Sequence, residues 1–180
     1  NLEINKFSIL VLGGSQAARV FAEVLPNIFY ECTEEKIPLK IYQHCLPSQN
    51  EKLKSFYEEK KIEFETFNFS NDLIEFFSKI NLAITRSGSS IQAELTNANI
   101  PFISVPLPSS ADNHQHKNAL YYQRKNYAFL LEEKDLNNKL LSYIKEFYDN
   151  KSILNKIAKN QRNHSDKNVY NIIDRTIEEI

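Results

Sequence analysis

The sequence contains no methionine and no tryptophan, and its 180 residues include only three glycines and two cysteines. Cys32 and Cys45 are too few for a disulfide framework, and their spacing matches no metal site of the Cys-x-x-Cys type. We therefore expect two buried structural thiols and a reducing compartment. Because the chain begins with Asn1 and lacks methionine, we also expect it to be a piece of a longer protein.

Long apolar runs and an excess of charge are also missing. No run approaches the ~18 apolar residues that a membrane-spanning helix needs, and no signal peptide is visible. The 22 Lys and Arg nearly balance the 23 Asp and Glu, so the net charge is -1. Such a chain lacks the basic field on which nucleic-acid binding depends, and we predict no nucleic-acid partner. Its length suits a single domain over residues 1–180.

The scarce glycines all occupy one kind of position. Gly13, Gly14 and Gly88 each follow an apolar, strand-like run and precede a helix-like one. Where glycine is so rare, each one indicates a need for positive φ or for room beside the backbone. A helix that begins there presents unpaired N–H groups and a positive dipole end, which suits a phosphate. We therefore predict two phosphate-binding loops.

Apolar periodicity predicts strands and helices in steady alternation. The strands are expected at residues 8–12, 39–43, 62–67, 81–85, 101–105 and 128–131. The helices are expected at residues 17–30, 49–60, 71–77, 89–97, 112–124, 136–148 and 153–180. This order predicts an α/β fold, a Rossmann-like doubly wound parallel sheet of about six strands. Ligands of such sheets bind beyond the C-terminal ends of the strands, where both glycine loops and the loop 106–112 lie.

Several details of these helices are also predicted. Pro26 is expected to kink or shorten the first helix, because proline lacks the N–H group that a helix interior needs. Asn71 and Asp112 are expected to cap two helices, and Ser87 or Ser89 a third. Leu120 and Tyr121 are expected to point inward. In the last helix, an apolar stripe over residues 169–180 is predicted to pack on another domain.

Familiar catalytic and cofactor motifs do not fit. The run GGSQAA lacks the G-x-G-x-x-G spacing of a dinucleotide site, and no G-K-[ST] of a P-loop occurs. Ser87 lies in RSGSS and not in the G-x-S-x-G of a hydrolase. His114 and His116 are two apart on a predicted helix, so they face different ways and form no metal face. His44 and Cys45 are adjacent in sequence, which is weak support for a paired nucleophile.

The remaining polar residues suit a nucleotide-sugar. Glu94 lies in the helix that follows the second glycine loop, where a carboxylate can accept two hydrogen bonds from a ribose diol. Gln115 and Asn118 are three apart, so they share a helix face and can present amides to sugar hydroxyls. Taken alone, the first glycine loop is also consistent with an ordinary tight turn, and Glu94 with a solvated surface charge. Together the features describe phosphate, ribose and sugar subsites.

Three runs carry a family resemblance. GGSQAAR, TRSGSSIQAEL and PLPSSADNHQHKNA, in this order, resemble the C-terminal, donor-binding domain of the MurG family of peptidoglycan N-acetylglucosaminyltransferases. The resemblance extends from about Ile9 to the final helix. It implies one half of a GT-B glycosyltransferase that moves N-acetylglucosamine from UDP-N-acetylglucosamine to lipid-linked muramoyl-pentapeptide, with inversion. It also implies a role in bacterial cell wall biogenesis, cell shape and division, and a peripheral location on the cytoplasmic face of the inner membrane.

The resemblance assigns donor binding position by position. Gly14 and Ser15 are expected to hold the diphosphate, Glu94 the ribose hydroxyls, and Arg86 to shape the floor of the site. The full set of substrate-binding residues that it implies is Gly14, Ser15, Gln16, Phe69, Ser70, Arg86, Gly88, Glu94, His114, Gln115 and Asn118.

The sugar and base ends follow from the same comparison. His114, Gln115 and Asn118 are expected to meet the sugar and its phosphate, and the backbone near Phe69 and Ser70 to meet uracil. No metal or other cofactor is implied, because the dipoles of the loops stabilise the UDP leaving group. Catalytic residues are expected in the family's N-terminal domain, which also holds the acceptor site and the membrane-contacting surface and is absent from this chain.

Departures from the family leave alternatives open. Ala17 stands where the family usually has a second glycine in GGSQG, and its Cβ could crowd the diphosphate. Without an N-terminal domain the chain alone is expected to bind donor and turn over little. Another GT-B enzyme that uses UDP-N-acetylglucosamine is one alternative, either a 2-epimerase or a dolichol-pathway transferase subunit. A non-catalytic nucleotide-sugar-binding module is the other.

Overall fold

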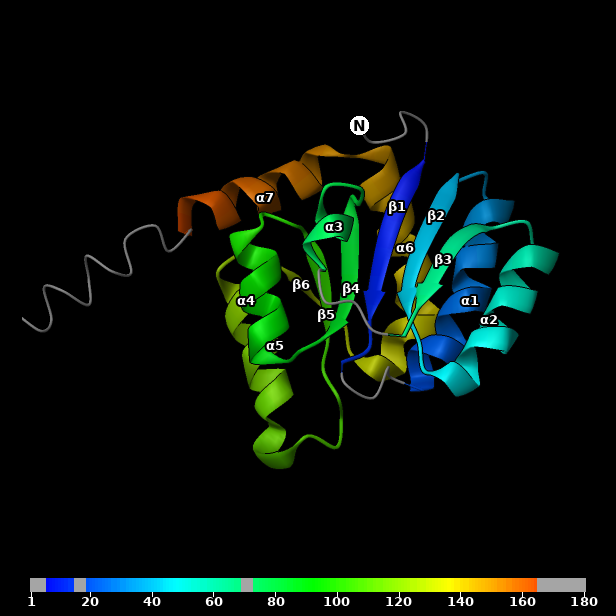
Figure 1. Cartoon of the computed structure of the whole chain (residues 1–180). Helices are drawn as coiled ribbons and strands as arrows, with labels where there is room; N and C mark the ends of the chain where they lie inside the picture. Colours follow the sequence, from blue (N-terminus) through cyan, green and yellow to red (C-terminus); the bar gives the residue numbers. More distant parts are fainter. Residues whose placement is uncertain (1–5, 15–18, 69–72, 165–180) are drawn as a thin grey trace, which may run out of the picture.

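A computed structural model describes residues 6–14, 19–68 and 73–164 of the chain. The strands form one sheet in the order β3-β2-β1-β4-β5-β6, and every neighbouring pair is parallel (Figure 1). This confirms the predicted Rossmann-like doubly wound sheet. Each strand lies within one residue of its predicted bounds: β1 Phe7–Leu12, β2 Leu39–His44, β3 Glu63–Phe67, β4 Leu82–Arg86, β5 Phe102–Val105 and β6 Phe129–Leu130.

Helices cover both faces of this sheet (Figure 1). One face carries α1 Arg19–Glu34, α2 Pro47–Glu59 and α6 Leu136–Asp149, and the other carries α3 Ile74–Phe77, α4 Ser89–Asn97 and α5 His114–Arg124. Two short 3-10 turns, η1 Ala111–Asn113 and η2 Glu133–Asp135, precede α5 and α6. The helix α7 Ser152–His164 contacts α4 and α6.

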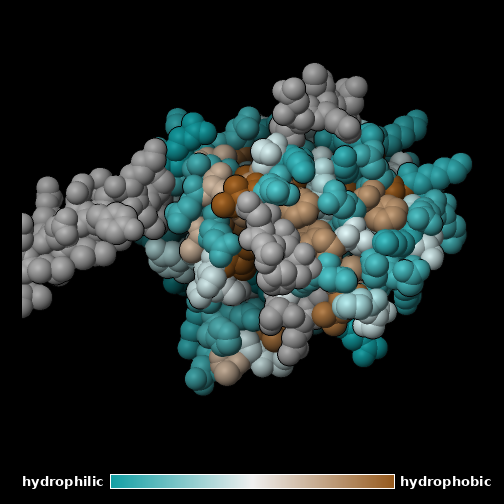
Figure 2. Space-filling view, viewed as in Figure 1, coloured by the Kyte–Doolittle hydropathy of each residue, from teal (hydrophilic) through white to brown (hydrophobic). Residues whose placement is uncertain are grey.

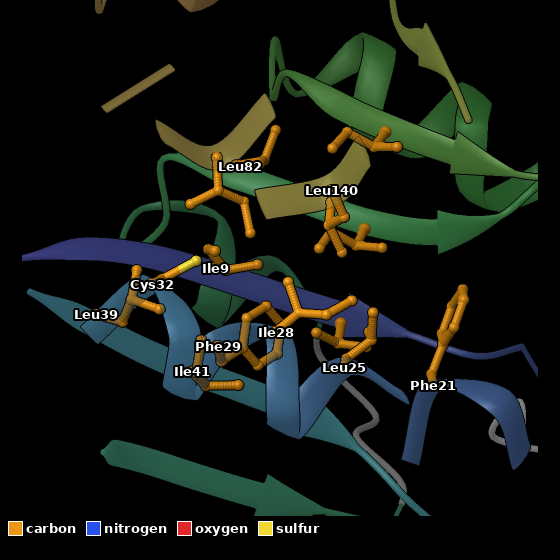
Figure 3. Close-up of a cluster of buried hydrophobic side chains, with 14 of the residues drawn as sticks. Ile9, Phe21, Leu25, Ile28, Phe29, Cys32, Leu39, Ile41, Leu82 and Leu140 are labelled. Carbon is orange, nitrogen blue, oxygen red and sulfur yellow. The ribbon is translucent and has the colours of Figure 1, made fainter. Parts of the chain in front are cut away.

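Alternation along β1 divides the hydrophobic core into two layers. Ile9 and Val11 face the cluster formed with α1, α2 and α6, and Leu10 and Leu12 face the cluster formed with α3, α4 and α5. Successive side chains of a strand point to opposite faces, so a strand buried on both sides is mainly apolar. All six residues of β1 are buried, and Ser8 is the one polar residue among them. Figure 3 shows Ile9 beside the α1 side chains Leu25, Ile28 and Phe29.

Pro26 was expected to kink or shorten the first helix, and the prediction that it shortens the helix is wrong. The helix α1 continues past Pro26 to Glu34, four residues beyond its predicted end at residue 30. Pro26 is buried in the helix face that packs on the sheet, together with Phe21, Leu25 and Phe29. Burial of this apolar face stabilises the helix more than the lost backbone hydrogen bond destabilises it.

Two of the predicted helix caps are also wrong. The N-cap of α4 is Gly88, with extended backbone and no side-chain cap, and Ser87 instead hydrogen-bonds Ser104. The helix α5 begins at His114, and Asp112 lies before it in η1 with φ of 48°. Asp112 therefore does not cap α5. The predicted Asn71 cap and the stripe at residues 169–180 lie outside the described residues.

The inward face of α5 differs from the prediction as well. Tyr121 is 49% exposed, while Ala119 is fully buried. The neighbouring Tyr122 packs edge-on against Phe102, with 5.9 Å between the ring centroids. Leu120, the other residue predicted to point inward, is partly buried, so the prediction is wrong for Tyr121.

The surface of the molecule is mainly hydrophilic on the face seen in Figure 2, with apolar side chains gathered near its centre. Within residues 6–14, 19–68 and 73–164, no helix is both long and apolar enough to cross a bilayer.

Candidate functional site

A cavity of about 410 Å³ opens at the C-terminal ends of the central strands. This is the end of a doubly wound sheet at which ligands bind. Strand ends, the first glycine loop and α4 all contribute to it. Its lining residues are Leu12, Gly14, His44, Leu46, Phe67, Asn68, Leu73, Thr85, Ser90, Ile91 and Glu94.

The two glycine loops differ in their backbone. Gly14 has φ of +76°, as predicted, and a Cβ placed on it would meet no atom within 4 Å. Gly88 has φ of −66°, so it needs no positive φ, and it is the N-cap of α4. The loop at Gly88 therefore does open a helix N-terminus, with unpaired N–H groups in its first turn. Ser15, Gln16 and Ala17 lie outside the described residues.

Glu94 reaches the cavity from α4, as the sequence suggested. Its side chain is exposed, and Ser90 and Ile91, about one turn earlier, line the same cavity. Residues three and four apart share a helix face, which explains the grouping. Gly14 and Glu94 are thus brought to one cavity although eighty residues separate them in sequence.

An apolar wall of the cavity was missed in the sequence. It is formed by Leu46, Phe67 and Leu73, and the ring of Phe67 stacks on Phe76 with 4.7 Å between centroids. Such a wall can pack against a flat ring of a ligand. The available signal was position, since Phe67 ends β3 and Leu46 follows β2 closely. Phe69 and Ser70, expected next to it, lie outside the described residues.

His44 is the polar residue of this wall. Its Nε2 lies 2.8 Å from the backbone oxygen of Asn68. A carbonyl only accepts hydrogen bonds, so Nε2 must carry the proton and donate it. His44 thereby ties the end of β2 to the loop that leaves β3.

Gln115 and Asn118 turn to one loop, as their spacing predicted, but neither lines the cavity. The Oε1 of Gln115 accepts from the backbone N–H of Ser87 at 3.2 Å and of Leu107 at 3.0 Å. The Nδ2 of Asn118 donates to the backbone oxygen of Ser87 at 3.1 Å. His114 is exposed, with Nδ1 2.7 Å from the backbone oxygen of Ala111. The loop 106–112 is therefore joined to the second glycine loop through α5 and not through the cavity.

Arg86 lies below the strand ends and is only 8% exposed. Its guanidinium donates to the backbone oxygens of Val105 at 3.4 Å and Pro106 at 3.3 Å, and to the carboxylate of Glu133. It also lies over the ring of Phe21, with Cζ 4.9 Å from the centroid. Arg86 thus connects β4 to β5, α1 and η2.

Both cysteines are free and buried, as predicted. Burial raises the pKa of the Cys32 thiol to about 12 and also raises that of Cys45. A thiol whose pKa is raised by burial is a weaker nucleophile. The Sγ of Cys45 lies 3.7 Å from Asn50 Oδ1 and 3.9 Å from Asn68 Oδ1, while His44 Nε2 contacts the backbone oxygen of Asn68. His116 Nδ1 lies 2.9 Å from Glu132 Oε1, whereas His114 Nδ1 contacts the backbone oxygen of Ala111. The described residues contain no group of three His, Cys, Asp or Glu side chains that could hold a metal ion.

Comparisons with known proteins agree with this geometry. The chain is 35% identical over 178 residues to a UDP-N-acetylglucosamine--N-acetylmuramyl-(pentapeptide) pyrophosphoryl-undecaprenol N-acetylglucosamine transferase of Pelagibacter ubique, covering 98% of this chain and 50% of the relative. The enzyme of the same name from Rickettsia bellii is 31% identical, covering 95% and 50%. The chain therefore spans about half the length of these curated relatives.

Solved structures share the fold. Acinetobacter baumannii MurG aligns with a TM-score of 0.84 at 24% identity, covering 100% of this chain and 54% of that one. A UDP-GlcNAc 2-epimerase from Neisseria meningitidis, bound to UDP-GlcNAc, aligns with a TM-score of 0.66 at 14% identity, covering 99% and 46%. The fold is thus Rossmann-like and corresponds to one half of a GT-B glycosyltransferase. Residues 8–176 match the glycosyltransferase family 28 C-terminal domain, and the chain belongs to this family.

Proposed function

We propose that residues 1–180 are the C-terminal, donor-binding domain of an inverting glycosyltransferase of peptidoglycan synthesis. The enzyme would transfer N-acetylglucosamine from UDP-N-acetylglucosamine to lipid-linked muramoyl-pentapeptide. The observation that carries the proposal is the single cavity that unites Gly14 of the first glycine loop with Glu94 of α4. The names of the curated relatives support the same substrates.

In this proposal the nucleoside occupies the cavity. The apolar wall with Phe67 and Leu73 packs against uracil. The family resemblance assigns the edge of uracil to the backbone near Phe69 and Ser70, which lie outside the described residues. The carboxylate of Glu94 accepts two hydrogen bonds from the ribose diol, which a charged acceptor makes strong.

The diphosphate lies between the two glycine loops. Gly14 follows the end of β1, and Gly88 presents the N-terminal turn of α4 from the end of β4. The family resemblance assigns Ser15 and Gln16, outside the described residues, to the diphosphate as well. Unpaired N–H groups and the positive end of the helix dipole favour an anion at such a turn. They also stabilise the negative charge that develops on UDP as it leaves, so no metal is required for that step.

The sugar extends from the diphosphate toward α5. Because Gln115 Oε1 and Asn118 Nδ2 are engaged with Ser87, the opposite ends of these amides, Nε2 and Oδ1, are the ones that can meet sugar hydroxyls. His114, exposed at the start of α5, meets the phosphate or the sugar. Arg86 acts from below by holding the strand ends together.

The acceptor site and the general base belong, in this proposal, to an N-terminal domain. That domain would also contact the cytoplasmic face of the inner membrane, so the whole enzyme is a peripheral membrane protein. The present chain alone should bind the donor and transfer little or no sugar.

Calorimetric titration tests the proposal. The chain is titrated with UDP-N-acetylglucosamine, UDP and NADH, and the Glu94→Ala variant is titrated with the same ligands. Loss of the ribose contact should cost about 1.5–3 kcal/mol, or roughly tenfold or more in affinity. Glu146→Ala is the matched control, because Glu146 is an exposed helical glutamate on α6 that does not line the cavity.

The outcomes distinguish the donor-binding proposal from its alternatives. Binding of the uridine ligands but not of NADH, weakened only by Glu94→Ala, supports the donor site. Formation of UDP-N-acetylmannosamine on incubation with the donor would point to the epimerase alternative. Folded chain that binds no uridine ligand would refute the proposal.

A further inference from the structure

Three buried polar side chains form a chain of hydrogen bonds behind the second glycine loop. Ser87, Gln92 and Ser104, which we call the Ser87 cluster, are each 0% exposed. Ser104 Oγ donates to Gln92 Oε1 at 2.8 Å, and the hydroxyls of Ser104 and Ser87 are 2.7 Å apart. Because the one proton of Ser104 goes to Gln92, Ser87 must donate to Ser104. The cluster therefore runs in one direction, from β4 through β5 to α4.

The main chain of Ser87 is held from the opposite side. Its N–H donates to Gln115 Oε1 and its carbonyl oxygen accepts from Asn118 Nδ2, both on α5. All three polar groups of Ser87 thus have partners on other elements. A residue fixed in this way has no alternative position of equal energy.

Ser87 lies where its position affects the start of α4. Ser87 directly follows β4 and directly precedes Gly88, the N-cap of α4. The position of Ser87 therefore sets the direction in which the first turn of α4 presents its N–H groups. The influence of a helix terminus on an anion falls off within this first turn, so small displacements there matter.

The later part of α4 has contacts of its own with the core. Leu95 is fully buried in the cluster that includes Leu10 and Phe102. Glu94 belongs to this part of the helix. The cluster therefore acts on the diphosphate end of the proposed site more than on the ribose end.

Ser104 of the cluster lies on a strand whose other residues are apolar. Phe102, Ile103 and Val105, the other residues of β5, are all fully buried and apolar. Burying polar groups costs free energy even when they are hydrogen-bonded, and an apolar replacement is often neutral or stabilising. Stability alone therefore does not account for Ser104.

We propose that Ser87, Gln92 and Ser104 are positioning residues that aim the N-terminal turn of α4 at the diphosphate of a nucleotide-sugar. The inference rests on the proposed function and adds to it three residues that do not line the cavity.

Two variants separate positioning from stability. Ser104→Ala leaves the Ser87 hydroxyl and Gln92 Oε1 buried without partners, so its melting temperature should fall. The triple variant Ser87→Ala/Gln92→Met/Ser104→Ala keeps the side-chain sizes similar and removes every polar group of the cluster. Its melting temperature should return toward that of the wild type.

Affinity is the deciding measurement. The triple variant should bind UDP-N-acetylglucosamine about tenfold more weakly, the loss of roughly one hydrogen bond to a charged group. Uridine, which has no diphosphate, should bind it as it binds the wild type. If the triple variant does not fold, Gln92→Met alone is measured in the same way at a temperature where circular dichroism shows native helix.

Other results overturn the inference. Unchanged affinity of the folded variant for UDP-N-acetylglucosamine would refute positioning while leaving the proposed function intact. Equal weakening of both ligands would assign the cluster a purely structural role. A wild-type chain that binds no uridine ligand would refute the proposed function, and this inference with it.

Discussion

Tyr57 illustrates what a single residue contributes to this fold. It is fully buried on α2, and its hydroxyl donates to Gln43 Oε1 on β2 at 2.5 Å. Burial raises its pKa well above the ordinary value, because the phenolate would lose its hydration. Tyr57 and Leu53 form the buried face of α2. The partner Gln43 is a polar residue inside a sheet, which periodicity does not predict.

The raised pKa of Tyr57 leads to an alkaline instability. Tyr57 stays neutral in the folded chain while an unfolded tyrosine ionises near pH ~10, so stability is present below that pH and is lost as pH rises above it. The expected slope is about 1.4 kcal/mol per pH unit for this one group. Urea denaturation between about pH 7 and 11 measures it.

Tyr57→Phe should flatten this slope and cost about 1–2 kcal/mol at neutral pH, because Gln43 Oε1 loses its donor. Tyr121→Phe is the control, since Tyr121 is 49% exposed and should change neither quantity. An alkaline slope that survives Tyr57→Phe in full would assign it to other groups, of which Cys32 is the first candidate.

At the scale of the elements, Arg86 is the residue that ties several of them together. It ends β4 and connects to the loop after β5, to η2 through Glu133 and to α1 through Phe21. The sequence placed Arg86 in a family motif and predicted a floor for the site. The partners of its guanidinium lie 20 and 47 residues later, and no local pattern marks them.

Arg86→Met should destabilise the fold by about 2–4 kcal/mol, because it leaves two backbone oxygens and the Glu133 carboxylate without their donor. Glu133→Gln should cost less, since its side chain is 26% exposed and an amide oxygen still accepts. Urea denaturation checks both variants.

Arg19→Met provides the comparison. Arg19 pairs with Glu23 on the surface of α1, with 86% of its side chain exposed, so its removal should leave the free energy of unfolding almost unchanged. Equal losses for Arg86→Met and Arg19→Met would contradict the role given to Arg86.

At the scale of the whole molecule, the proposed ligand should stabilise the fold. A ligand that binds only the native state contributes about 2.7 kcal/mol at a concentration of 100 times its dissociation constant. For a domain of this size each kcal/mol raises the melting temperature by about 2–4 °C, so the shift should be roughly 5–11 °C. Differential scanning fluorimetry with UDP-N-acetylglucosamine measures it.

NADH at the same concentration serves as the control and should leave the melting temperature unchanged. The run GGSQAA lacks the G-x-G-x-x-G spacing of a dinucleotide site. Equal shifts in melting temperature with NADH and with UDP-N-acetylglucosamine would show that binding does not depend on the uridine group.

The sequence by itself determined the fold class, the six strands to within one residue and the two glycine loops. These features follow from local patterns, because burial on both faces of a sheet favours short, mainly apolar runs and a turn with positive φ, as at Gly14, favours glycine. Glu94 was also identified from the sequence as a candidate site residue, because it lies in the helix that follows the second glycine loop.

Only the tertiary structure decided the caps of α4 and α5, the apolar wall of the cavity and the Ser87 cluster. Ser87 was expected to cap a helix, and its hydroxyl instead meets Ser104, which is 17 residues away along the chain. The hydrogen-bond partner of the Ser87 hydroxyl depends on which strand lies beside β4. A side chain that has several possible partners takes the one that the packed fold brings within reach, and that is settled only once the sheet has formed.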